Sequence, residues 1–197
     1  MRVSTRRSGE CVGRKLWQSA SVVAAALLLA AAALCCYSSF AWGQKMNLTS
    51  ASFQEGSRIP AKYTCSGANI SPQLAWNAPP PAATASLALI VTDPDAPRGT
   101  WVHWVLYDLP AETRALPEGL SALGQLPNDA RQSRNDFGET GYGGPCPPPG
   151  SPHHYVFTLY ALKAKLNLPV GATRVQVEAA MQRHILASGR LVGLFRR

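Results

Sequence analysis

Two aspartates follow an apolar run near the middle of the chain. The stretch TDPDAP, residues 92–97, sets Asp93 and Asp95 one residue apart, with a proline close after each. Proline fixes its own φ and restricts the residue before it, so both carboxylates would be held stiffly at a strand end. Such carboxylates can orient an imidazole or meet a cation. A turn in which aspartate only makes local hydrogen bonds is the alternative that these residues leave open.

A histidine lies inside the apolar stretch that follows. His103 stands in WVHWVLY, residues 101–107, and strand alternation would put it on one face with Trp101, Val105 and Tyr107. An imidazole buried there needs a hydrogen-bond partner. A core histidine without a ligand is the plainer alternative.

A third stretch, SPHHYVFTLYAL (residues 151–162), enters a strand with two histidines and a tyrosine. Alternation puts His153 and Tyr155 on one face and His154 on the other. If the strands pair with their ends aligned, four side chains converge on one pocket: Asp93, His103, His153 and Tyr155. Imidazole and phenol groups can donate to an anion, while the carboxylate fixes a tautomer or meets a cationic group. A phosphate ester bearing an amine would satisfy both.

The elements that must position these side chains are mainly strands. Apolar and β-branched runs predict clear strands at 87–92, 101–107 and 155–162, and weaker ones at 47–53, 73–76 and 191–195. The Pro- and Gly-rich connections between them favour a mainly β fold, an antiparallel β-sandwich with few peripheral helices.

One helix is expected near the C-terminus, from Thr173 to about Ala187. Thr173 and Gln176 fit a capping box, and Gly189 would end the helix before the last strand. Its apolar face would consist of Val177, Ala180, Met181, His184 and Ile185, with His184 a partly buried packing residue. The long loop over residues 124–150 is expected to be ordered, with an Asx-type turn at 135–138.

Four stretches together resemble the phosphatidylethanolamine-binding protein family, also called Raf kinase inhibitor-like, and its short bacterial branch in particular. They are YTCSGANISPQLAW (63–76), LIVTDPDAPRGTWVHWVLYDLP (89–110), NDFGETGYGGPCPPPGSPHHYVFTLYAL (135–162) and LVGLF (191–195). The resemblance implies a β-sandwich with a surface pocket for phosphate-like anions or phospholipid head groups. No cofactor or metal is expected. The ligand-binding residues that it implies are Asp93, Asp95, Pro97, His103, Pro147, His153 and Tyr155.

Two residues depart from the pattern of the family. His154 stands where the family usually has arginine, so a titrating group replaces a permanent charge. Ser66 stands where an acidic residue commonly follows the cysteine of YTC. The first change puts a structural ion pair in doubt more than the pocket itself.

The N-terminus has the order of a signal peptide. Five basic residues precede position 16, an uncharged apolar run spans 19–34, and Ser39-Phe40-Ala41 fits the small-x-small rule. We expect cleavage after Ala41, leaving one domain over residues 42–197 in the periplasm or outside the cell. An uncleaved anchor, a lipidated Cys35 or Cys36, and twin-arginine export remain alternatives.

Charge and cysteine content follow from this cleavage. Five of the 19 basic and one of the 11 acidic residues precede position 42, so the net charge falls from +8 to +4. No basic stripe with interleaved aromatics predicts nucleic-acid binding. Two of the five cysteines remain, Cys65 and Cys146. In an oxidising compartment they are candidates for a disulfide, with two free buried thiols as the alternative.

Three classes of function compete. A non-enzymatic binding protein fits the pocket best. The alternative is a protein-interaction module, such as a protease inhibitor or an envelope signalling regulator, and a homodimer is possible in either case. A hydrolase or metalloenzyme is disfavoured because HExxH, CxxC and G-x-S-x-G patterns are absent from the sequence.

Overall fold

A computed structural model describes residues 44–76 and 83–197 of the chain. The expected leader at 1–41 and its cleavage after Ala41 lie outside these described residues. No helix within them is long and apolar enough to cross a bilayer.

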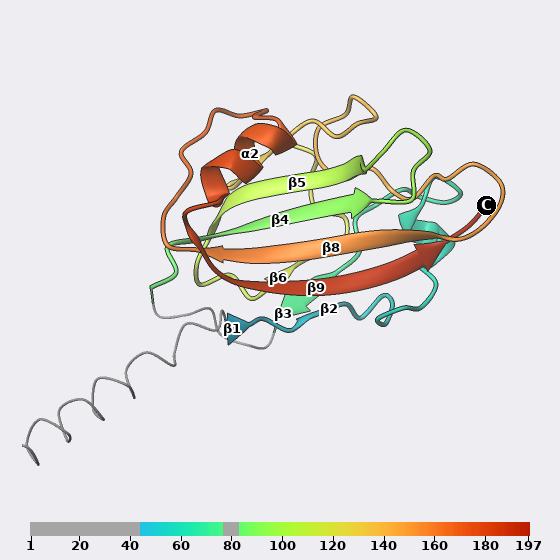
Figure 1. The fold of residues 1–197 in the computed structure, drawn as a ribbon, viewed down its shortest axis with the longest axis horizontal. Coiled ribbons are helices and arrows are strands. Elements are labelled where there is room, and N and C mark those ends of the chain that lie inside the picture. The colour runs from blue at the N-terminus through green and yellow to red at the C-terminus, as the bar shows by residue number, and fades with distance from the viewer. Residues whose placement is uncertain (1–43, 77–82) are drawn as a thin grey trace, which may run out of the picture. The chain divides into compact units, whose positions relative to one another are not determined.

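The larger of two sheets has six strands in the order β1-β9-β8-β4-β5-β7. Its strands are β1 (Gln44–Lys45), β4 (Ser86–Asp93), β5 (Trp101–Pro110), β7 (Arg131–Gln132), β8 (His153–Leu162) and β9 (Ile185–Phe195). Neighbours pair antiparallel except β1 with β9. Figure 1 shows β5, β4, β8 and β9 side by side as long strands. The three clearest strands predicted from the sequence are therefore present.

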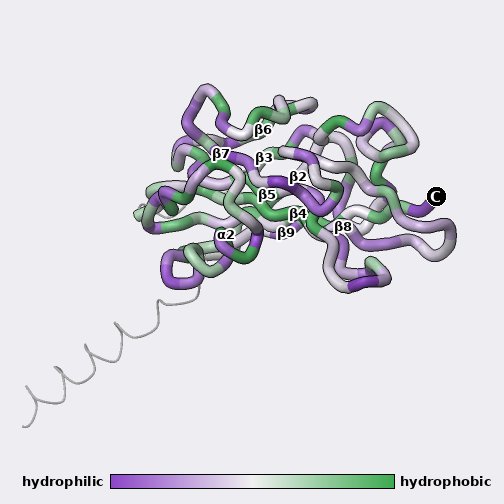
Figure 2. Tube along the Cα trace, turned by 90° about the horizontal axis from the view of Figure 1, so that it is seen from above, coloured by the Kyte–Doolittle hydropathy of each residue, from purple (hydrophilic) through white to green (hydrophobic). Residues whose placement is uncertain are grey.

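The smaller sheet and the larger one enclose the main core. Strands β2 (Leu48–Thr49), β3 (Leu74–Trp76) and β6 (Ala115–Leu116) form the small sheet, and a short 3-10 helix, η1, spans Ala61–Tyr63. Leu74 and Trp76 pack with Leu89 and Phe157 of the large sheet. In Figure 2 the hydrophobic stretches lie along the central strands, while many outer loops are hydrophilic. The mainly β sandwich is confirmed, although β2 is much shorter than the strand expected over 47–53.

Helix α2 (Arg174–Met181) packs on the opposite face of the large sheet. Val177 and Met181 pack against Ile90, Val105 and Tyr107 in a second core cluster. The capping box is present, since Thr173 and Gln176 bond each other's backbone N–H. Because β4 alternates strictly, its even residues face this helix and its odd residues face the small sheet.

The predicted C-terminal end of this helix is wrong. The His184 N–H bonds the Met181 carbonyl, and the chain then enters β9 at Ile185, which was expected to be helical. Gly189 does not end the helix but lies inside β9, where an added Cβ would come within 2.5 Å of the Met46 carbonyl oxygen. Glycine is thus required by a close backbone approach within a strand.

Strand β5 carries one extra residue near each end. Val91 and Thr92 of β4 pair with Trp104 and Val102, so His103 between them has no partner. The same shift occurs near Asp108. A bulge reverses the alternation beyond it. The expected grouping of His103 with Val105 and Tyr107 is therefore wrong.

Candidate functional site

A small pocket opens where β4 ends and where β5 and β8 begin, and most of the predicted site residues gather there. It has a volume of about 170 Å³ and is lined by Asp93, Ala96, Pro97, Trp101, His103, Phe137, Cys146, Pro147, Pro148 and His153. Five of the seven predicted residues line it. Asp95 and Tyr155 do not.

The carboxylate of Asp93 orients one histidine of the pocket. His153 Nδ1 donates to Asp93 Oδ2 at 2.7 Å, and the side chains are only 12% and 5% exposed. The other carboxylate oxygen accepts from the Asp95 N–H at 2.9 Å. The proline-stiffened loop therefore folds back on Asp93, the last residue of β4. The carboxylate of Asp93 thus fixes both the loop and the imidazole of His153.

The bulge in β5 turns the second histidine toward the same cavity. His103 Nδ1 donates to the Gly143 carbonyl at 2.6 Å, and the Gly143 N–H donates back to the His103 carbonyl at 2.8 Å. Its ring stands edge-on to Tyr155, with ring centroids 5.1 Å apart. Burial lowers the pKa of His103 below its ordinary value. The ring is therefore neutral at pH 7, with its proton on Nδ1.

An Asx-type turn builds the opposite wall. Asn135 Oδ1 accepts from the N–H groups of Phe137 and Glu139, as the sequence predicted. Asp136 Oδ2 bonds the Val102 N–H at 2.7 Å, which ties this turn to the start of β5. The ring of Phe137 then packs edge-on against Trp101 and His103.

Sequence reasoning missed several lining residues, namely Ala96, Trp101, Phe137, Cys146 and Pro148. All lie next to or within the recognised motifs, but only the folded loops bring them to the cavity. For Phe137 the Asx turn was the one available signal.

Cys65 and Cys146 come together beside the pocket. Their sulfur atoms lie 2.09 Å apart, at the distance of a disulfide bond, and 81 residues separate them along the chain. The Cys65 N–H also donates to the Pro145 carbonyl, and Asn69 Oδ1 accepts from the Gly144 N–H. The loop that supplies Gly143, Cys146 and the prolines is thus attached to the segment after η1.

Asp95 acts at the outer side of the pocket wall. Its Oδ2 accepts from both the backbone N–H and Nδ1 of His154, each at 2.7 Å. The backbone hydrogen bond from His154, followed by its side-chain bond, lowers the pKa of Asp95. As alternation predicted, His154 points away from the cavity. The pairing that was in doubt is present as a hydrogen bond between Asp95 and His154, with histidine in place of arginine.

Tyr155 lies behind the pocket. It is buried, and its hydroxyl has no hydrogen-bond partner among the described residues. Burial raises the pKa of Tyr155 well above its usual range, and the negative charge of Asp93 raises it further. The hydroxyl therefore remains a protonated donor.

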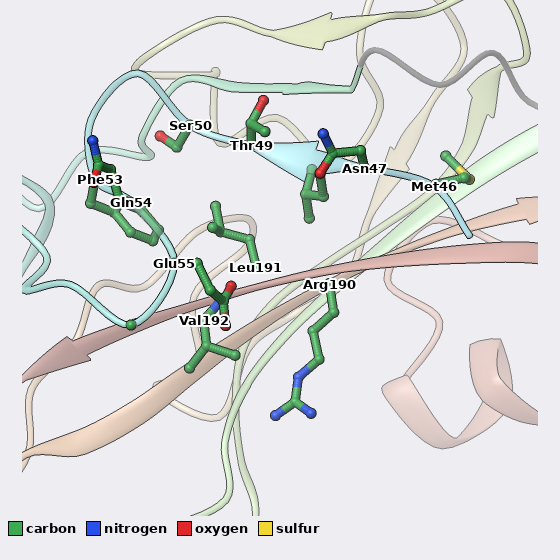
Figure 3. Close-up of a pocket in the computed structure, with 12 residues that line it drawn as sticks. Met46, Asn47, Thr49, Ser50, Phe53, Gln54, Glu55, Arg190, Leu191 and Val192 are labelled. Carbon is green, nitrogen blue, oxygen red and sulfur yellow. The ribbon is translucent and has the colours of Figure 1, made fainter.

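A larger groove lies between β2 and β9, with a volume of about 750 Å³. Figure 3 shows Met46, Asn47 and Thr49 along one wall and Leu191 and Val192 on β9. Its lining residues in the described part of the chain include one cation, Arg190, and one acidic residue, Glu55, but no histidine or tyrosine. Size alone therefore does not make this groove the better candidate for an anion.

The described residues contain no group of three or more histidine, cysteine or acidic side chains that could hold a metal ion. The fold and the pocket define a class: a β-sandwich with a small, mainly apolar cavity at one edge of the large sheet, into which one aspartate and two histidines are set.

Comparison with known proteins identifies the family. The family model described as phosphatidylethanolamine-binding protein matches residues 49–196. A UPF0098 protein of Methanothermobacter thermautotrophicus is 47% identical over 152 residues, which cover 77% of this chain and 99% of the relative. The lipoprotein-named LppC of Mycobacterium tuberculosis is 42% identical, covering 77% of this chain and 73% of LppC. The chain belongs to the phosphatidylethanolamine-binding protein family.

A solved structure supports the same assignment. Escherichia coli YbcL, described as a member of the mammalian family, superposes with a TM-score of 0.72 at 33% identity, covering 78% of this chain and 99% of YbcL. The predicted family membership is confirmed.

Proposed function

We propose that this protein is an exported, non-catalytic binding protein that takes a phosphate-like anion or a phospholipid head group in the pocket at Asp93, His103 and His153. One observation carries the proposal. Both histidines have Nδ1 occupied by a fixed acceptor, so each ring has Nε2 left for a ligand. Nε2 can accept from a protonated phosphate oxygen or, once the imidazole is charged, donate to an anionic one.

The surroundings of the histidines hold the pocket in one conformation before a ligand binds. Pro97 and Pro147 restrict the backbone on two sides, and each ring is held by a hydrogen bond at 2.7 Å or less. A site that is formed before the ligand arrives loses little conformational freedom on binding. The volume of about 170 Å³ suits a head group better than a whole lipid.

Export is the second part of the proposal. The charged, apolar and small-residue segments of positions 1–41 have the order of a signal peptide. A bridge between Cys65 and Cys146 requires an oxidising compartment, and one relative is named as a lipoprotein. Mass spectrometry of the protein from a cell-envelope fraction tests this: a chain starting at Trp42 supports it, and an intact N-terminus in the cytoplasm contradicts it.

Calorimetric titration tests the pocket. Inorganic phosphate and phosphorylethanolamine are titrated into the wild-type protein, His103→Ala and the control His184→Ala, whose histidine lies outside the pocket. We expect saturable heat in the wild type and control, and at least about a tenfold weaker affinity in His103→Ala. Circular dichroism checks that each variant is folded. Equal affinity in all three proteins would place any anion elsewhere, and no heat in the wild type would reject the proposed ligand class.

A further inference from the structure

A second histidine–aspartate pair stands directly beside the one that lines the pocket. Asp95 is two residues after Asp93, and His154 directly follows His153. The two pairs are linked, because the Asp95 N–H donates to Asp93 Oδ1 and the His154 N–H donates to Asp95 Oδ2. The outer pair is the more exposed, at 56% for His154 and 41% for Asp95.

Titration of the outer pair changes its charge without breaking it. Nδ1 of His154 holds its proton against Asp95 in both forms of the ring, so protonation occurs at Nε2. Asp95 remains a carboxylate while the imidazole titrates, since hydrogen bonds from His154 lower its pKa. The pair therefore carries one negative charge when His154 is neutral and none when it is protonated.

Within residues 44–76 and 83–197, the charged and titratable groups around His154 come from the end of β4 with the loop after it, from β8, and from beyond β9. Asp95 approaches from the loop after β4, and His153, the neighbour of His154 in β8, is itself paired with Asp93 at the end of β4. Its partner on β9 is Leu194, which does not titrate. Beyond that strand, Arg58 lies over the Phe195 ring, and Arg197 donates to the Pro147 carbonyl. Asp95 is thus the direct partner of His154.

We propose that His154 sets the electrostatic potential of the anion pocket, so that affinity for anions rises as the pH falls and His154 becomes charged. This inference rests on the function proposed above, because it needs an anion in the pocket. When His154 is neutral, the unbalanced Asp95 carboxylate repels that anion. When His154 is charged, the repulsion is offset.

Sulfate is a suitable probe, because it stays a dianion throughout the range in which histidine titrates. It is titrated calorimetrically at pH 5.5 and pH 8.0, at one low ionic strength, into the wild type, His154→Arg, His154→Gln and the control His184→Gln. His154→Arg keeps the positive charge at both pH values, and His154→Gln removes it at both.

The expected result is a crossed pattern. At pH 8.0, His154→Arg should bind sulfate about three- to fivefold tighter than the wild type, and His154→Gln should match it. At pH 5.5, His154→Arg should match the wild type and His154→Gln should bind about three- to fivefold weaker. If His154 has a purely structural role, both variants should bind sulfate more weakly than the wild type at both pH values. That result would overturn the inference. If the wild type binds sulfate and all four proteins share one pH profile, only this inference fails. If the wild type binds inorganic phosphate but no sulfate at either pH, only this inference is rejected; if it binds neither anion, the proposed function fails with it.

Discussion

The two bulges of β5 hold polar residues in opposite circumstances. At the helix-covered end, Asp108 accepts hydrogen bonds from the N–H groups of Leu166 and Asn167, and Arg131 approaches its carboxylate at 3.8 Å. At the pocket end, His103 has one nitrogen bonded to Gly143 and the other beside a cavity. A β-bulge thus attaches a loop at one end of β5, and at the other end it leaves a histidine nitrogen free to bond a ligand.

This difference separates structural polar groups from candidate ligand groups better than burial does. Asp108 and His103 are both nearly inaccessible, at 4% and 2%. What distinguishes them is whether their hydrogen-bonding capacity is used within the protein. Buried polar groups are normally satisfied, so capacity left open at a cavity suggests a partner that arrives from outside.

The largest expected effect is on stability and comes from the Cys65–Cys146 bridge beside the pocket. Replacing both Cys65 and Cys146 by serine should lower the free energy of unfolding by about 4 kcal/mol, because a bridge across 81 residues restricts the unfolded chain. Urea unfolding of the two proteins measures the difference. Wild type treated with a dithiol should match the double variant, whereas an unchanged wild-type midpoint after reduction would show that the cysteines are not bridged in solution.

At the helix-covered end, Asp108→Ala should lower the free energy of unfolding by about 3 kcal/mol, since two backbone N–H groups lose their acceptor. Asp108→Asn is the matched variant, because asparagine tolerates the positive φ of 55° at this position. Asp108→Asn should lower the free energy of unfolding by less than Asp108→Ala does. Phosphate affinity, measured on the folded proteins, should be unchanged in both. A loss of affinity would mean that the two ends of β5 are coupled.

The buried imidazole of His103 should make stability depend on pH. Burial lowers its pKa in the folded state below the ordinary 6.5, so the unfolded state binds more protons as the pH falls below 6.5. Stability is then lost with a slope of at most about 1.4 kcal/mol per pH unit. In His103→Asn, whose amide can still donate to Gly143, this part of the slope should disappear. Unfolding of both proteins in urea between pH 5 and pH 8 measures it, and identical slopes would contradict a buried neutral ring.

The sequence was most informative where local pattern and fold agree. The runs at 87–92, 101–107 and 155–162 correspond to β4, β5 and β8, because apolar residues fill both faces of a sheet that is covered on both sides. Motifs also pointed to five of the ten residues that line the pocket. The facing of His103 could not be predicted, since a bulge is defined only by the pairing of two strands.

Glycine misled the reading of the C-terminal segment for a related reason. Gly189 was expected to end a helix, yet Gly189 and Gly193 are both buried positions of β9 and alternate there with exposed or partly exposed residues. Their small size is required by Met46 at one position and by Ile59 and Phe53 at the other. These neighbours are distant in sequence, so no local pattern could predict them.

The smallest expected effect comes from two tyrosines that differ in one hydrogen bond. The Tyr107 hydroxyl donates to the Pro169 carbonyl at the helix-covered end, while that of Tyr155 has no partner among the described residues. Tyr107→Phe should therefore cost about 1 kcal/mol of unfolding free energy, and Tyr155→Phe close to none. Urea unfolding of the two variants beside the wild type measures this contrast.

The same pair tests whether the open hydroxyl serves the ligand. If it becomes a donor within the bound complex, Tyr155→Phe should weaken phosphate binding severalfold while leaving stability intact, and Tyr107→Phe should do the reverse. If Tyr155→Phe instead costs as much stability as Tyr107→Phe, its hydroxyl is already bonded in solution, and the contrast between the two ends of the sheet no longer depends on unused hydrogen-bonding capacity.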